Sequence, residues 1–117
     1  MILAAVDDLL FSSKIRTVAK QIGVEVVFAR TPADILAQAR TRTPALALFD
    51  LNSQQVQPLQ TIAALKADPG LRAIRTVGFV SHVQTGLIEA ARKAGTDEVM
   101  ARSAFAASLA DILATGQ

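Results

Sequence analysis

A short apolar run that stops on a carboxylate narrows the choice of fold more than any other part of this chain. Residues 46–49 are apolar without alternation, and Asp50 follows them directly. An unbroken apolar run of this length is typical of a strand buried on both faces in the middle of a parallel sheet. Ligands of open α/β sheets bind outside the carboxyl ends of the strands, so we expect Asp50 to lie at such an edge.

The start of the chain repeats this pattern. Residues 2–6 form a second apolar run, and Asp7 and Asp8 follow it. If the two strands are parallel neighbours, three carboxylates meet at one edge of the sheet. Like charges this close repel, so the cluster requires a cation or shifted pKa values. The alternative is that Asp7 and Asp8 are an ordinary acidic pair at a helix N-terminus, where the helix dipole favours them.

The remaining chain alternates between predicted strands and predicted helices. The strands are expected at residues 2–6, 24–29, 46–50, 76–80 and 98–101. The helices are expected between Asp8 and Gly23, from Thr31 to the polar run 40–43, from Pro58 to the turn at 68–70, around residues 87–91 up to Gly95, and after Ser103. Strict alternation with short connections predicts one parallel sheet with helices on both faces.

Gly23 and Gly95 are the expected C-terminal caps of the first and fourth helices, and two other helices have predicted N-terminal caps. Thr31 is followed by Pro32, a pair that favours a helix starting at the proline. Ser103 is the expected N-cap of the last helix.

Composition excludes several classes of protein. With 117 residues, 51% hydrophobic and 19% charged, the chain is expected to form a single globular domain over residues 1–117. A net charge of +2 is too even to indicate nucleic acid or a membrane surface as a partner. No apolar run approaches the ~20 residues of a membrane span. The chain has no cysteine, which excludes disulfides and fits a reducing, cytoplasmic compartment.

A resemblance to a known family emerges from the residues that follow the predicted strands. These residues are Asp7 and Asp8, Asp50, Ser81 and Arg102, and they belong to the segments Val6-Asp7-Asp8, Leu48-Phe49-Asp50-Leu51-Asn52 and Ala94-Gly95-Thr96-Asp97 with a basic residue beyond. In this order, they resemble the CheY-like receiver domain of two-component response regulators along essentially the whole chain. The resemblance implies a flavodoxin-like (βα)5 fold, a doubly wound parallel sheet with strand order 2-1-3-4-5.

The resemblance also implies a metal site. Mg²⁺ would be held by Asp8, by Asp50 and by the backbone carbonyl of Asn52, and Asp7 would hold a metal-bound water. Few protein ligands and several waters are usual for this ion.

The implied function is phosphorylation. Asp50 would accept a phosphoryl group, Ser81 would hydrogen-bond it, and Arg102 stands where the family has a phosphate-pairing lysine. Such a chain is a signalling protein and not an enzyme. Its implied partners are a histidine kinase or phosphotransfer protein, a downstream protein target and, through the fourth helix, fifth strand and fifth helix, a second copy of itself.

Several departures from the family pattern leave a second interpretation open. Arginine replaces lysine at position 102, Ser103 replaces a proline, Val99 replaces an aromatic residue, and residues 53–57 contain neither proline nor glycine. His82 also stands beside Ser81, where the family keeps a small residue. The alternative is therefore a pseudo-receiver, a phosphorylation-independent module for protein interaction or dimerisation.

The same residues also have simpler explanations. Arg102 could bridge Asp50 or Asp8 as a counter-ion in place of a metal, and Ser81 could cap the fourth helix. Adjacent Ser81 and His82 cannot converge as a hydrolase pair, so we expect His82 to lie in a loop or on the surface. A flavodoxin-like cofactor binder is disfavoured because no Gly-rich or hydroxyl-rich loop follows the first strand.

Overall fold

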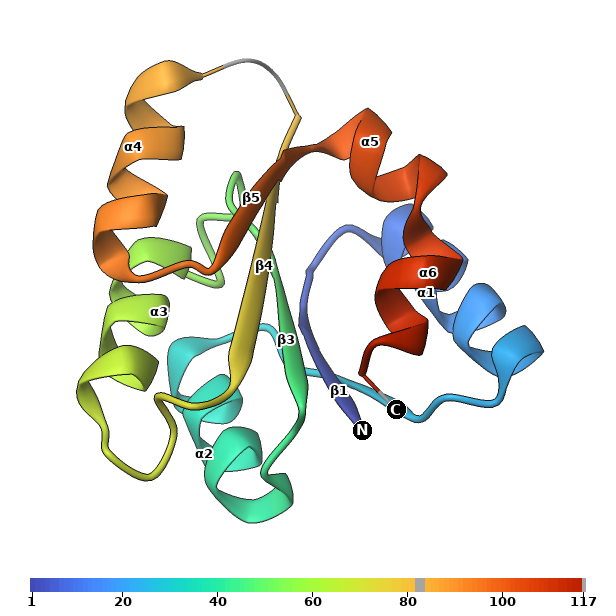
Figure 1. Ribbon diagram of the computed structural model, residues 1–117, viewed down its shortest axis with the longest axis horizontal. Helices are drawn as coiled ribbons and strands as arrows, with labels where there is room; N and C mark the ends of the chain where they lie inside the picture. Colours follow the sequence, from blue (N-terminus) through green and yellow to red (C-terminus); the bar gives the residue numbers. More distant parts are fainter. Residues whose placement is uncertain (82–83, 117) are drawn as a thin grey trace.

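A five-stranded parallel sheet forms the centre of the molecule (Figure 1). The computed structural model describes residues 1–81 and 84–116. The strands are β1 (Ile2–Ala5), β2 (Val26–Phe28), β3 (Leu46–Asp50), β4 (Arg75–Val80) and β5 (Glu98–Ala101). The helices are α1 (Leu9–Ile22), α2 (Pro32–Arg42), α3 (Pro58–Ala67), α4 (Thr85–Ala94), α5 (Arg102–Ala107) and α6 (Leu109–Ala114).

The strand order is β2-β1-β3-β4-β5, which confirms the predicted order. In this register Ala5 of β1 is paired with Phe49 of β3, and Asp50 is paired with Phe79 of β4. The residues that follow β1, β3 and β4 therefore emerge at the same edge of the sheet. This is the edge at which the sequence predicts a site.

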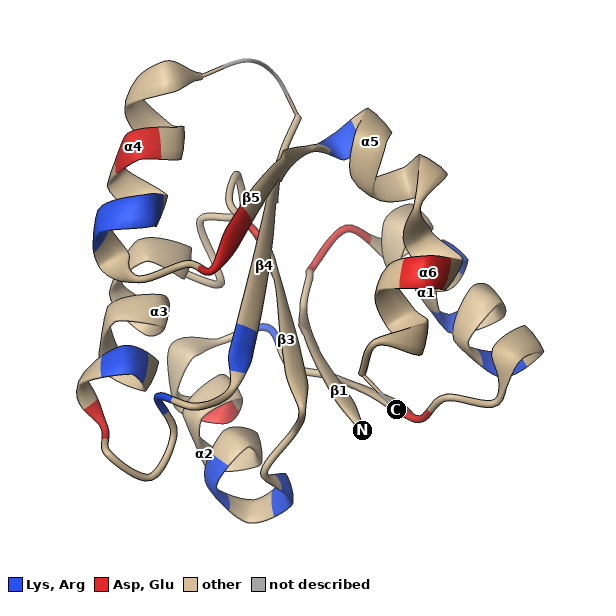
Figure 2. Cartoon of the chain, in the orientation of Figure 1, with Lys and Arg blue, Asp and Glu red and all other residues tan. Residues whose placement is uncertain are grey.

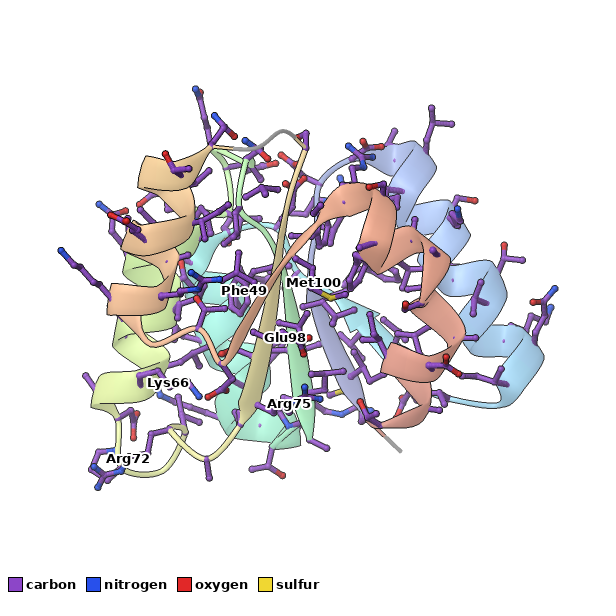
Figure 3. All side chains as sticks on the ribbon, turned by 45° about the horizontal axis from the view of Figure 1, so that its top comes forward. Phe49, Lys66, Arg72, Arg75, Glu98 and Met100 are labelled. Atoms are coloured by element: carbon purple, nitrogen blue, oxygen red, sulfur yellow. The ribbon has the colours of Figure 1, made fainter. Side chains whose placement is uncertain are left out.

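Helices cover both faces of the sheet. Figure 1 shows α2, α3 and α4 on one side and α1, α5 and α6 on the other. Each side has its own apolar core. Figure 3 shows Phe49 in the core beneath α2, α3 and α4, and Met100 against the core beneath α1, α5 and α6. Every residue of β1 and β3 is buried, which explains why their apolar runs show no alternation.

Local sequence signals account for several of the helix ends. The Thr31 hydroxyl accepts a hydrogen bond from the Asp34 N–H at 3.2 Å, and Pro32 is the first residue of α2, as predicted. Gly23 and Gly95 follow α1 and α4 with φ of 76° and 110°, a left-handed conformation that favours glycine.

The last helix differs from the prediction at its start and in its middle. Ser103 does not cap it, because α5 begins at Arg102, directly after β5, and Ala101 occupies the N-cap position without a side-chain cap. The helix is also interrupted at Ser108, so that α5 and α6 are separate. Phe105 of α5 and Leu109 of α6 are both buried in the core.

The helices are short. The 14 residues of α1 bury one stripe, which includes Phe11, Ile15 and Ala19, against the sheet. Among the residues that the structure describes, no helix has both the length and the apolar character needed to cross a membrane.

Candidate functional site

The candidate site is the edge of the sheet at which the strands end, called here the carboxyl edge. Its residues are those predicted from the sequence, Asp7, Asp8, Asp50, Asn52, Ser81 and Arg102. Figure 2 shows the acidic turn after β1 and the basic start of α5 on this side of the molecule. The structure brings these residues to one edge of the sheet, and their individual roles stay predictions.

Asp50 is the most enclosed acidic residue of the carboxyl edge. It is the last residue of β3 and only 8% exposed, and its Oδ1 accepts a hydrogen bond from the Asn52 N–H at 3.0 Å. Burial raises the pKa of Asp50 above its ordinary value, against the opposing effects of the Asn52 N–H and the charge of Arg102. The carboxyl group thus has a firm backbone partner on one oxygen.

Asp8 has partners on both of its oxygens. Oδ1 accepts a hydrogen bond from the Phe11 N–H at 3.0 Å, so that Asp8 is the N-cap of α1. Oδ2 accepts one from Arg102 Nη2 at 2.8 Å. The Arg102 hydrogen bond is the main reason that the pKa of Asp8 lies below its ordinary value. Two of the alternative roles drawn from the sequence, helix acid and arginine counter-ion, are therefore realised here.

Asn52 binds the loop after β4. Its side-chain Oδ1 accepts hydrogen bonds from the Ser81 N–H at 2.7 Å and from the Ser81 hydroxyl at 2.9 Å. Its Nδ2 donates to Gln84 Oε1 at 2.7 Å. Ser81 does not cap α4, because Gln84 is the N-cap of that helix and makes no side-chain cap bond.

The side-chain role of Asn52 was missed by sequence reasoning, which assigned this residue only a backbone carbonyl. An amide that can accept and donate at once is the chemical signal that could have found it. His82, the other residue predicted beside Ser81, lies outside the described residues.

The predicted metal ligands were Asp7, Asp8, Asp50 and Asn52. Asp8 has both oxygens engaged by Phe11 and Arg102. Within residues 1–81 and 84–116, no group of three or more acidic or histidine side chains is placed to hold a metal ion. In this arrangement the residues do not fit a divalent cation.

A cavity of about 310 Å³ lies next to Asn52, between the loop after β3, the start of α3 and α4. Its apolar wall comes from Leu51, Pro58, Leu59 and Leu87. The other lining residues are the uncharged Asn52, Ser53, Gln54, Gln57 and Gln60. The charged part of the carboxyl edge thus borders a neutral hollow, which the sequence did not indicate.

Comparison with known proteins identifies the fold. No protein-family model and no curated protein matches the sequence. The chemotaxis response regulator CheY4 of Vibrio cholerae is 14% identical with a TM-score of 0.83, over 99% of this chain and 97% of that one.

Two further response regulators are similar at comparable levels. The phosphorylated cyanobacterial phytochrome response regulator RcpA is 23% identical with a TM-score of 0.76, over 96% of this chain and 86% of that one. The Mn²⁺-bound response regulator Rcp1 is 18% identical with a TM-score of 0.80, over 95% and 89%. The strand order and both helical layers thus agree with these proteins, and the chain has the fold of the CheY-like receiver domains of response regulators, in a divergent sequence.

Proposed function

We propose that this chain is a receiver-type signalling module that acts through contacts with other proteins and does not depend on phosphorylation of Asp50. One observation carries this proposal: Ser81, the residue expected to bind an arriving phosphoryl group, is already bonded to Asn52. Asn52 also donates its N–H to Asp50. Asp50 and Ser81, the two groups that would receive the phosphoryl group, are thus both hydrogen-bonded to Asn52.

Opening this arrangement has an energetic cost. To bind a phosphoryl oxygen, the Ser81 hydroxyl must leave Asn52 Oδ1, and a net hydrogen bond contributes about 0.5–1.5 kcal/mol. The Asn52–Gln84 bond adds a further connection between the loop after β3 and the start of α4. The arrangement in which Asn52 is bonded to Ser81 and Gln84 is therefore favoured while no phosphoryl group is bound.

The residues around the carboxyl edge support the same proposal. Val99, at the position where the family carries an aromatic switch residue, lies half-buried on β5 and has no ring to move inward. Arg102, at the position of the phosphate-pairing lysine, is bonded to Asp8. The basic residue expected to pair with phosphate is thus engaged by Asp8, and the expected switch position has no aromatic ring.

The second candidate function is a phosphoacceptor, and the placement of Asp50 favours it. Asp50 ends β3, and no described residue donates a hydrogen bond to its Oδ2. In this scheme Oδ2 forms a bond to phosphorus while the phosphorus–nitrogen bond of a histidine kinase or phosphotransfer protein breaks. The surface formed by α4, β5 and α5 would then communicate the phosphorylated state to a downstream protein target or to a second copy of the chain.

Intact-mass spectrometry after incubation with acetyl phosphate separates the two functions. RcpA, which is known in phosphorylated form, is the positive control. We expect no mass gain for the wild-type chain, with or without MgCl₂, because the two groups expected to bind the phosphoryl oxygens are engaged elsewhere, Ser81 by Asn52 and Arg102 by Asp8. A gain of one phosphoryl group that disappears in Asp50→Asn would contradict the proposal and establish the phosphoacceptor.

A further inference from the structure

An aromatic ring and partial burial hold the Arg102–Asp8 ion pair in addition to its hydrogen bond. The Arg102 guanidinium carbon lies 4.5 Å from the centroid of the Phe11 ring. Both partners of the pair are about one-third exposed. A cation held over an aromatic face and partly shielded from water is bound more firmly than a surface arginine.

The Phe11 ring beneath Arg102 is itself packed against two other aromatic rings. Phe11 packs against Phe79 at 5.0 Å and against Phe105 at 5.7 Å between ring centroids, and those two rings stack at 4.5 Å. Arg102 itself is the first residue of α5 and follows β5 without a loop. The guanidinium is therefore positioned by the sheet, by α1 and by α5 together.

The amide of Phe11 completes the arrangement around Asp8. The Phe11 N–H occupies Asp8 Oδ1 and Arg102 occupies Oδ2, so that each oxygen has a strong donor. Mg²⁺ demands near-octahedral oxygen ligands at about 2.0–2.1 Å. To bind Asp8 Oδ2 it would have to displace a charge-assisted hydrogen bond and then lie beside the displaced positive charge.

We infer that the Arg102 guanidinium is the resident cation of the carboxyl edge and replaces the divalent metal that the receiver fold implies. The inference stands on Asp8, Arg102 and Phe11, whereas the proposed function stands on Asn52 and Ser81. Each can therefore fail without the other.

The test is the binding of Mg²⁺ by calorimetry and of Mn²⁺ by electron paramagnetic resonance. We expect the wild-type chain to show no saturable binding up to about 10 mM, because the metal would have to displace the Arg102 hydrogen bond to Asp8 and then lie beside that positive charge. Arg102→Gln removes the charge and frees Oδ2, so its dissociation constant should fall at least about tenfold below that limit. Adding Asp8→Asn to Arg102→Gln should abolish the gained site.

Arg75→Gln is the matched control. Arg75 also pairs with a carboxylate, Glu98 at 3.0 Å, but it lies at the amino end of β4, away from the carboxyl edge. This variant should bind metal no better than the wild-type chain. Circular dichroism checks that each variant keeps the fold.

Two results would overturn the inference. One is wild-type binding at about 1 mM that Asp8→Asn removes. The other is a folded Arg102→Gln chain that gains no site.

If Arg102→Gln fails to fold, a measurement on the wild-type chain tests whether a metal displaces Arg102. In ¹⁵N nuclear magnetic resonance, the Arg102 Nε–H signal should keep its position when MgCl₂ is added, relative to NaCl of equal ionic strength. A saturable shift of that signal would mean that the metal displaces the guanidinium, and the inference would be wrong.

Discussion

Lys66 joins three segments at the end of the sheet opposite the carboxyl edge, where Figure 3 labels it near Arg72 and Arg75. Its ammonium donates to the carbonyl oxygens of Arg72 at 3.2 Å and Ile74 at 2.8 Å, and to Asp97 Oδ2 at 2.9 Å. All three of its N–H donors are thus used. The end of α3, the start of β4 and the turn before β5 are held by this one side chain.

Asp97 is the acidic partner in this cluster. Its Oδ2 accepts hydrogen bonds from the Thr76 N–H at 2.8 Å and the Thr76 hydroxyl at 3.1 Å, in addition to Lys66. Burial raises the pKa of Asp97, but the hydrogen bonds from Lys66 and Thr76 outweigh it, so that the pKa lies below the ordinary value of 3.8. The folded chain therefore favours the charged form of Asp97.

Asp97→Asn should lower the free energy of unfolding at pH 7 by about 1–2 kcal/mol, since charge-assisted hydrogen bonds are lost. The wild-type advantage is fully present above the ordinary carboxyl pKa and is lost as pH falls through the lower pKa of the folded state. Urea unfolding of both chains at pH 7 and at about pH 3 measures this difference. The side chain is 45% exposed, so solvent screening limits the effect.

Glu89→Gln is the control for this experiment, because Glu89 is exposed in the middle of α4. It should leave the stability within about 0.5 kcal/mol at both pH values. An equal loss for Asp97→Asn at pH 7 and at acid pH would show that charge is not the cause.

At the level of the elements, the two glycines at the ends of α4 should respond in opposite directions to alanine. A Cβ added to Gly95, at φ 110°, would lie 2.7 Å from Lys66 Cγ, and the Lys66 ammonium is held by three hydrogen bonds. Gly86, in the first turn, has no atom within 4 Å of an added Cβ. Gly95→Ala should therefore destabilise the chain by about 1–3 kcal/mol, and Gly86→Ala should stabilise it by up to about 1 kcal/mol.

Thermal and urea unfolding of the two variants check this pair. Because both changes add one methyl group, one in the first turn of α4 and one directly after its last residue, their difference isolates the backbone conformation and the Lys66 contact. Equal effects of the two changes would show that neither matters.

Sequence signals predicted the elements where the cause is local. Thr31 with Pro32, and Gly23 and Gly95, act within one helical turn, and the buried strands β1 and β3 are visible as unbroken apolar runs. Ser103 was assigned wrongly because a hydroxyl can be an N-cap only where its own residue lies outside the helix with an extended backbone, whereas Ser103 is the second residue of α5. The start of α5 is instead set by β5 running directly into Arg102.

The candidate site could be predicted as a location but not as a set of contacts. The strand ends place Asp8, Asp50 and Ser81 at one edge, and this follows from a parallel sheet alone. The Arg102–Asp8 bond joins residues 94 positions apart, and in this rotamer the Arg102 guanidinium also lies over the Phe11 ring. Such rotamer choices depend on tertiary packing and leave no local pattern in a sequence.

At the scale of the whole molecule, the sheet separates two independent cores. Ile15 is fully buried on the side of α1, and Ile62 is fully buried on the side of α3. Ile15→Val and Ile62→Val should each cost about 0.5–1.5 kcal/mol. Their effects should add within about 0.5 kcal/mol in the double variant, because they share no partner.

A contacting pair supplies the contrast. Phe11 and Phe105 lie 5.7 Å apart within one cluster, so Phe11→Leu and Phe105→Leu should deviate from additivity by at least about 0.5 kcal/mol. Urea unfolding of the four single and two double variants measures both couplings. Strong coupling between Ile15 and Ile62 would mean that the sheet transmits packing changes from face to face.

The positive charge beside Asp8 is covalently attached to α5. A dissociable ion responds to its concentration and can be removed by a chelator, whereas a tethered guanidinium is always present at one per chain. Any motion that carries the start of α5 away from α1 also removes the charge from Asp8. The charge at the carboxyl edge therefore depends on the position of α5. A partner protein that binds α5 and moves it would change that charge.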